Sequence, residues 1–142
     1  LNMLFKAILF LMVNFISMEK VNHINDLKWN YRVLVIKSAD GIVLLNKMDL
    51  FKEELEERDF IVIYIEGKSS FLKNRKMSDY FTRSVIKKIK SSEYSNYLFL
   101  IGKDGELKNS YSSDIEIERI LSDVDKMPMR KFEILNKIKK KS

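Results

Sequence analysis

The sequence predicts an α/β protein of the thioredoxin-like fold class, with the element order β-α-β-α-β-β-α. Two continuous apolar runs, 33–36 and 60–65, are typical of strands covered on both faces, as in a central parallel sheet. A third run, 97–102, is followed by a turn at 103–105 and an alternating segment at 106–111, which predicts an antiparallel hairpin with an edge strand. We therefore expect a mixed four-stranded sheet with helices on both faces.

Helical periodicity between these runs supplies the crossover that two parallel strands need. A first helix is expected over 41–58, because apolar residues recur at helical spacing on one face. That face consists of Leu44, Met48, Phe51 and Leu55. A second helix is expected over 78–90, with Ser78 as its N-cap. Its buried face consists of Phe81, Val85 and Ile89. Trp29, just before the first strand, is expected to be a core anchor beneath it.

The clearest helical pattern lies near the end of the chain. Ser113 and Glu116 have the spacing of a capping box. The apolar face that follows is formed by Ile117, Ile120, Leu121 and Val124. Pro128 ends this helix and can begin a short further one, since proline is tolerated at a first helical turn. Met127 and Met129, on either side of the proline, are expected to fill the core.

The first residues have the pattern of a secretory signal peptide, with Lys6 before a short apolar run. We expect residues 1–17 to be removed, 18–136 to form the thioredoxin-like domain and 137–142 to be a basic tail. Export to the periplasm or outside the cell would follow, with no transmembrane span left after signal removal. A buried first helix or an uncleaved anchor are alternatives. If Met18 starts the protein, it is cytoplasmic.

The composition excludes several kinds of chemistry. The chain has no cysteine, which removes disulfides, thiolate catalysis and cysteine metal sites, so no thiol redox activity is expected. His23 is the one histidine and cannot supply a metal site alone, and it falls in a segment expected to be disordered. No cofactor is expected. The net charge of +6 is mildly basic and does not predict specific nucleic-acid binding. The basic segment 68–90 is either a solvated surface or a patch for anions or a membrane.

The position with the best prospects for function is the junction Lys37–Gly41, between the first strand and the first helix. Lys37, Ser38 and Asp40 lie where this topology builds sites and where helix N–H groups point outward. Helix capping is the alternative role for Ser38 and Asp40. "EGKSS" at 66–70 is not a phosphate-binding loop, because Val62 stands where that motif requires glycine.

Four blocks of the sequence resemble a bacterial family of domains of unknown function that is similar to the DUDES domain of animal extracellular proteins. They are "DLKWNYRVLVI", "ERDFIVIYI", "YLFLIGKDGELK" and "DVDKMPMRKFEI". The resemblance covers roughly residues 26–134 and implies a thioredoxin-like fold, export in many members and no settled activity. True redox thioredoxins carry a cysteine at the first strand-to-helix junction and a cis-proline before the third strand. Here those places read "KSADG" and "SSEYSNY".

Two hypotheses about function remain open. The first is a non-catalytic exported domain that binds a partner protein or a small anionic ligand. The second is a cryptic enzyme, either a thiol-free redox relative or a hydrolase, with its site at Lys37–Gly41. A pocket with converging titratable side chains would favour the enzyme, and an apolar surface would favour the binding domain.

Overall fold

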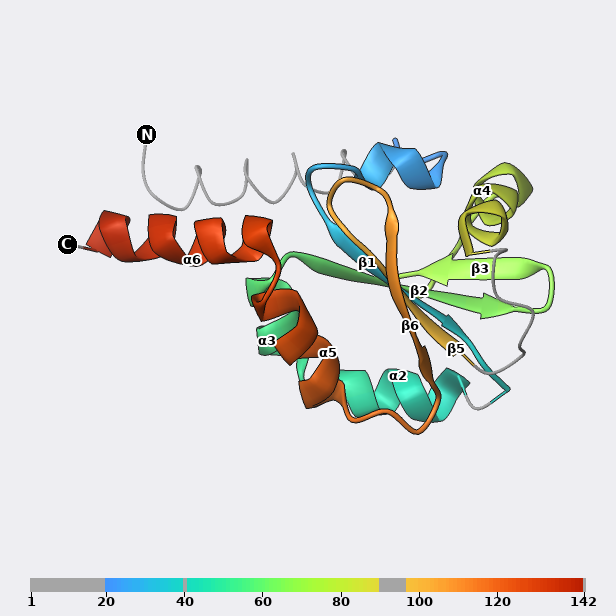
Figure 1. The fold of residues 1–142 in the computed structure, drawn as a ribbon. Coiled ribbons are helices and arrows are strands. Elements are labelled where there is room, and N and C mark those ends of the chain that lie inside the picture. The colour runs from blue at the N-terminus through green and yellow to red at the C-terminus, as the bar shows by residue number, and fades with distance from the viewer. Residues whose placement is uncertain (1–19, 40, 90–96, 142) are drawn as a thin grey trace, which may run out of the picture.

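The computed structural model of the protein describes residues 20–39, 41–89 and 97–141. Over these residues the chain is a mixed α/β structure in which helices pack on both faces of one sheet (Figure 1). The elements follow in the order η1 (Ile24–Leu27), β1 (Arg32–Lys37), α2 (Gly41–Asp49), α3 (Lys52–Glu57), β2 (Phe60–Glu66), β3 (Ser69–Leu72), β4 (Arg75–Lys76), α4 (Asp79–Ile89), β5 (Tyr97–Ile101), β6 (Leu107–Ser112), α5 (Ile117–Asp125) and α6 (Pro128–Lys141).

The described strands form a six-stranded sheet in the order β4-β3-β2-β1-β5-β6. β1 and β2 run parallel, because α2 and α3 carry the chain back to the same end of the sheet between them. β5 is antiparallel to β1, and β6 is antiparallel to β5. The predicted mixed sheet is confirmed. The prediction of four strands is wrong, because β3 and β4 extend the sheet beyond β2.

Two tight turns create the additional strands. Gly67 begins the turn between β2 and β3 with a φ of 59°, and Lys73 and Asn74 join β3 to β4 with φ values of 50° and 63°. Two-residue hairpin turns need such left-handed backbone, which glycine adopts freely and asparagine tolerates. Lysine has no such preference, so the sequence "LKNRK" does not predict a hairpin.

Successive residues of β1 point to opposite faces and divide the core into two layers. Val33 and Val35 pack beneath η1 and α4, in a layer that includes Phe81, Val85 and Ile89. Leu34 and Ile36 pack beneath α2, α3 and α5, in a layer that includes Leu44, Met48, Leu55, Ile117, Ile120, Leu121 and Val124. The predicted helix faces are therefore buried as expected. None of the helices in the described part of the chain is long and apolar enough to span a membrane.

The first predicted helix is divided in two. The N–H groups of Leu50 and Phe51 donate to carbonyl groups three residues earlier, at Lys47 and Met48, and this tightened turn ends α2. α3 then continues the same apolar face, so Leu55 is buried. The second predicted helix is α4, and the Phe81 N–H donates to Ser78 Oγ at 3.1 Å, which confirms Ser78 as its N-cap.

Three predictions near the ends of elements are wrong. α5 begins at Ile117 with Glu116 as its N-cap, and Glu116 makes no capping bond through its side chain, so Ser113 and Glu116 form no capping box. Trp29 is 65% exposed, because a φ of 69° turns the chain before β1. Met129 is 42% exposed on α6, whereas Met127 packs against the core. Pro128 is the first residue of α6, as expected of proline.

Candidate functional site

The junction predicted as a site lies in a small crevice at the carboxyl ends of β1 and β2. Lys37 ends β1 and is half-buried, and Ser38 is buried directly after it. The crevice has a volume of about 380 Å³ and is lined by Lys37, Ser38, Ala39, Tyr64, Ile65, Glu66 and Gly67. The Ser38 carbonyl accepts the N–H of Gly41 at 3.2 Å, which connects the strand end to the start of α2. Asp40 lies outside the described residues.

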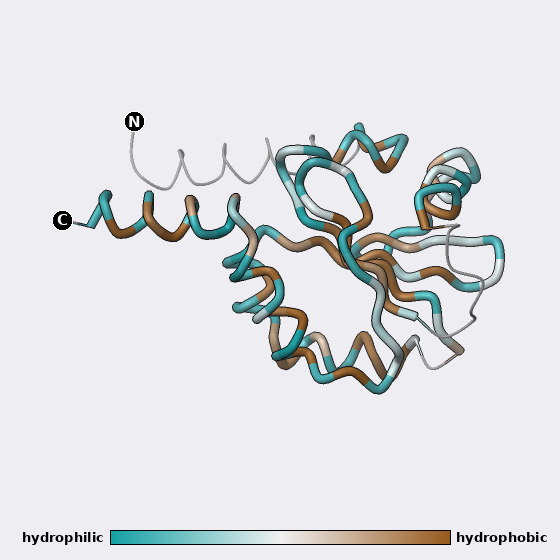
Figure 2. The backbone as a smooth tube through the Cα atoms, in the orientation of Figure 1, coloured by the Kyte–Doolittle hydropathy of each residue, from teal (hydrophilic) through white to brown (hydrophobic). Residues whose placement is uncertain are grey.

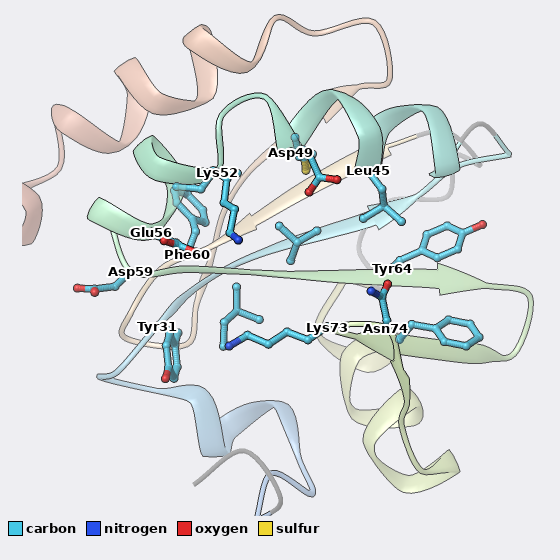
Figure 3. A pocket seen from close by; sticks show the side chains of 15 residues that line it. Tyr31, Leu45, Asp49, Lys52, Glu56, Asp59, Phe60, Tyr64, Lys73 and Asn74 are labelled. Atoms are coloured by element: carbon cyan, nitrogen blue, oxygen red, sulfur yellow. The ribbon is translucent and has the colours of Figure 1, made fainter. Parts of the chain in front are cut away.

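A larger groove runs along β2 on the same face of the sheet. It has a volume of about 460 Å³, within the range of small-molecule sites. Its lining is Tyr31, Leu45, Met48, Asp49, Lys52, Leu55, Glu56, Asp59, Phe60, Ile61, Val62, Tyr64, Phe71, Lys73 and Asn74. Figure 3 shows the side chains of α2 and α3 along one side of the groove and those of the β3–β4 hairpin along the other. The groove exists because the added hairpin widens the sheet beyond the area that α2 and α3 cover.

Tyr64 lies at the boundary between the groove and the crevice, because it lines both. Its ring stacks on Phe71 of the neighbouring strand, with centroids 6.2 Å apart and an interplanar angle of 27°. The ring also lies against the backbone of Gly41, where a Cβ atom would be 2.0 Å from Tyr64 Cε2. Glycine at the first position of α2 therefore permits the close contact that holds this aromatic ring in place.

The wall of the groove is mainly apolar and aromatic, and its charged side chains carry both signs. Asp49, Glu56 and Asp59 supply carboxylates, and Lys52 and Lys73 supply ammonium groups. In Figure 3 these charged groups come from both sides of the groove, away from its Tyr64 end, and do not point toward one spot. Such a surface can hold an elongated, mostly apolar molecule and orient its polar ends.

A cluster of eight charged side chains lies at the opposite end of β1. We call it the ionic cluster, and it contains Arg32, Glu57, Arg58, Asp59, Lys103, Asp125, Arg130 and Glu133. At its centre, Glu133 of α6 accepts two bonds from Arg32, each at 3.1 Å, and a third from Lys103 at 2.6 Å. Lys103 also reaches Asp59, at 2.8 Å. Side chains from β1 and from the β5–β6 turn thus meet on one carboxylate of α6, and Lys103 links that carboxylate to Asp59.

The second half of the ionic cluster is centred on Asp125, at the end of α5. Arg58 donates to both of its oxygens at 2.9 Å, and Arg130 Nε donates to Oδ1 at 3.2 Å. Arg130 also binds Glu57, at 2.9 Å. Among the described residues, no buried side-chain nitrogen or oxygen lacks a hydrogen-bond partner. Positive and negative groups are equal in number, so the cluster is satisfied internally.

The pKa values in the ionic cluster favour the charged forms. Burial raises the pKa of Glu133, but the bonds from Arg32 and Lys103 outweigh it and leave that pKa below its ordinary value. The bonds from Arg58 lower the pKa of Asp125, against the opposing effect of burial. Burial lowers the pKa of Arg130, but Asp125 and Glu57 raise it by more. Groups held in this way join elements together and offer no proton donor or acceptor near neutral pH.

The four sequence blocks singled out above meet in the ionic cluster. Arg32 comes from the first block, Asp59 from the second, Lys103 from the third, and Asp125, Arg130 and Glu133 come from the fourth. Sequence reasoning recognised the blocks without recognising that their charged residues are partners. Two sequence features could have indicated the ionic cluster: a lysine inside a tight turn and an arginine at the first position of an apolar strand.

Other residues considered in the sequence have structural roles. His23 lies in the N-cap of η1, where its Nδ1 accepts the Asn25 N–H at 3.0 Å, so the expectation of a disordered position is wrong. Its ring lies 5.6 Å from that of Tyr80. In the part of the chain that the structure describes, no three histidine, aspartate or glutamate side chains gather as a metal site would require. Burial and the bond to Asp123 both raise the pKa of Tyr111.

Fold and site together define a mixed α/β domain with an internal ionic cluster at one end of β1 and an open apolar groove along β2. The family described as "Domain of unknown function (DUF4174)" matches residues 23–133, and the chain belongs to this family. The match ends at Glu133, so it includes every member of the ionic cluster and the whole lining of the groove. No curated protein and no solved structure is similar enough to the chain to count as a match.

Proposed function

We propose that this protein is a non-catalytic, exported, thioredoxin-like domain that binds an elongated apolar ligand in the groove beside β2. The observation that carries the proposal is the groove itself, which presents Tyr31, Tyr64 and Phe71 beside a floor of Phe60 and Val62. Aromatic and aliphatic walls with a few charged groups are typical of binding sites for organic molecules. The ionic cluster supports the proposal indirectly, because its bonds hold the starts of β1 and β2 in place and β2 forms the groove floor.

The thioredoxin-like part of the proposal is supported by the inner strand order β2-β1-β5-β6. In that subset the first two strands are parallel and the last two are antiparallel, as expected of an N-terminal βαβ half followed by a C-terminal ββα half. Export is supported by Lys6 and the apolar run after it. N-terminal sequencing of the protein purified from cells tests export, and an intact Met3 start in the cytosolic fraction would refute it.

Fluorescence of Nile red, an uncharged apolar dye, tests binding in the groove. Leu45 lines the groove, whereas Val43 on the same helix is 66% exposed. Leu45→Arg places a long charged side chain in the groove and should weaken dye binding by roughly tenfold or more, since the arginine occupies apolar space that the uncharged dye would fill. Val43→Arg is the matched control and should bind the dye as the unaltered protein does. Equal binding by both variants would refute the groove as the site.

The second candidate is an enzyme with its site in the crevice at Lys37 and Ser38. One observation favours it: Lys37, Ser38 and Glu66 line the same open crevice, so a hydroxyl and two charged side chains border one space. Insulin reduction with dithiothreitol and consumption of hydrogen peroxide test the thiol-free redox version. We expect no turnover above a heat-denatured control, since both reactions need a thiolate that the chain lacks. Turnover that is abolished by Ser38→Ala would establish the enzyme instead.

A further inference from the structure

α6 contacts the rest of the domain along one stripe. Arg130, Glu133 and Lys137 are spaced three and four positions apart, so they share one face of the helix. Arg130 and Glu133 belong to the ionic cluster, and Lys137 Nζ lies 3.4 Å from the carbonyl oxygen of Glu57. The stripe contacts Arg32 of β1 and Glu57 of α3. The helix itself extends away from the two core layers (Figure 1).

The opposite face of α6 carries large apolar side chains in contact with solvent. Phe132, Leu135 and Ile138 are 65%, 57% and 60% exposed, and none of them belongs to either core layer. Figure 2 shows hydrophobic and hydrophilic positions alternating along this helix. Single exposed apolar residues are ordinary, but a row of them along one helix marks an interaction surface.

Lysines accompany these apolar residues. Lys131 and Lys139, each four positions from Leu135, share its face of the helix and are exposed. Lys137, Lys140 and Lys141 continue the stripe of Arg130 and Glu133 instead. The one acid of the helix, Glu133, is engaged by Arg32 and Lys103 in the ionic cluster. The outer surface of α6 is therefore both apolar and positive. A partner that matches it must offer an apolar interior and a negatively charged surface together.

We propose that the outer face of α6 docks on an anionic lipid surface. Phe132, Leu135 and Ile138 would enter the boundary between headgroups and acyl chains, while the lysine stems lie along it and their ammonium groups reach the phosphates. Fourteen residues of helix span roughly 21 Å, which is short of a bilayer, so the helix lies in the plane of the interface.

Other occupants fit the surface less well. A second copy of α6 would bring two sets of lysines together, and like charges in contact repel. A nucleic acid would engage the lysines but leave the aliphatic side chains without a role, since bases stack on aromatic rings and guanidinium planes. An acidic protein is the remaining rival, and the experiment separates it from lipid.

The test is co-sedimentation of the full chain with phosphatidylcholine vesicles that contain or lack phosphatidylserine. The measured quantity is the ratio of the two binding constants, so contributions that do not depend on anionic lipid cancel. Replacing Lys131 and Lys139 by glutamine should lower the ratio about 25-fold, since each lysine near an anionic surface contributes roughly fivefold. Replacing Phe132, Leu135 and Ile138 by serine should weaken binding to the anionic vesicles roughly tenfold or more.

Two matched controls keep the test specific. Arg75 and Lys76 changed to glutamine remove the same charge from β4, and Ile42, Val43 and Leu50 changed to serine remove exposed apolar residues from α2 and the turn after it. Both control variants should bind the anionic vesicles with a binding constant within about threefold of that of the unaltered protein. Equal losses in controls and α6 variants would overturn the proposal. So would binding to polyglutamate that equals binding to the anionic vesicles and survives the serine substitutions, which would assign the face to an acidic protein.

Discussion

Replacing Glu133 by glutamine removes the central charge of the ionic cluster while keeping the size of the side chain. Its partners Arg32 and Lys103 have side chains that are 2% and 9% exposed, so water cannot readily replace the lost carboxylate. Removing one member of a buried ion pair costs about 3–5 kcal/mol, because the remaining charge stays buried without compensation. Arg32 keeps its bond to the Arg58 carbonyl and Lys103 keeps Asp59, so we expect a loss near the lower end, about 3 kcal/mol.

Urea unfolding followed by circular dichroism measures this loss as a fall in the free energy of unfolding. The control is Asp104→Asn, which breaks the ion pair with Lys108, where the two side chains are 33% and 32% exposed. An exposed pair of this kind contributes less than about 1 kcal/mol. Equal, small losses in Glu133→Gln and Asp104→Asn would show that burial around Glu133 does not matter and would refute the reasoning.

A second substitution separates the lost bond from the charge left behind. Arg32→Met in the Glu133→Gln background removes the arginine that had lost its partner. Replacing both members of a buried pair by side chains without charge is often neutral or stabilising, so part of the loss should be recovered. If the double variant loses the sum of the two single losses, the two side chains do not act as a pair.

Three further predictions concern pH and packing. The pKa values of Glu133 and Asp125 lie below their ordinary values of 4.5 and 3.8. The stability that these two groups contribute is therefore present above the ordinary values and is lost as the pH falls through the lower folded pKa values. The free energy of unfolding, measured as a function of pH, should fall in that acid range, and it should fall less steeply in Glu133→Gln. Gly41→Ala places a methyl group against the Tyr64 ring and should lower stability by about 1–3 kcal/mol and Nile red binding with it. In Gly67→Ala the new methyl meets no atom and strains only the left-handed turn, so stability should fall while dye binding stays unchanged. Ile120→Ala should cost about 2–5 kcal/mol in urea titration, since Ile120 is fully buried, and a loss of a few tenths would contradict the assignment of that face.

Local patterns in the sequence predicted the central elements well, because hydrophobic burial follows the period of a strand or a helix. Continuous apolar runs identified β1, β2 and β5, and helical spacing identified the buried faces of α4 and α5. The β3–β4 hairpin escaped prediction because its turn uses Lys73 and Asn74, and lysine is not a usual residue for left-handed backbone. The groove depends on that hairpin, so it could not be predicted without it.

The ionic cluster could not be predicted for a different reason. Its pairs join positions that are far apart in the chain, such as Arg32 with Glu133 and Arg58 with Asp125. Charge has no period that reports which residues meet, and only the fold brings these partners together. The sequence did contain the blocks that supply them, so the importance of those segments was visible while their physical role was not.

Asp59 belongs to the ionic cluster and also lines the groove. Substitutions at this position separate the effect of backbone strain from the effect of the bond to Lys103. Asp59 follows the last residue of α3 and its cap Arg58, with a φ of 55°, in the left-handed region where glycine is favoured. Its carboxylate binds Lys103 at 2.8 Å but is 49% exposed, so this bond contributes less than about 1 kcal/mol. Asp59→Gly relieves the backbone while losing that bond, and the two effects should offset to within about 1 kcal/mol. Asp59→Ala loses the bond and adds strain, because aspartate tolerates left-handed backbone better than alanine does, so it should cost about 1–2 kcal/mol. Equal losses in urea titration would show that the backbone makes no contribution at this position.

Because Asp59→Gly leaves Glu133 with Arg32 and Lys103, a change in Nile red binding by this variant reports on the groove wall and not on the stability of the ionic cluster.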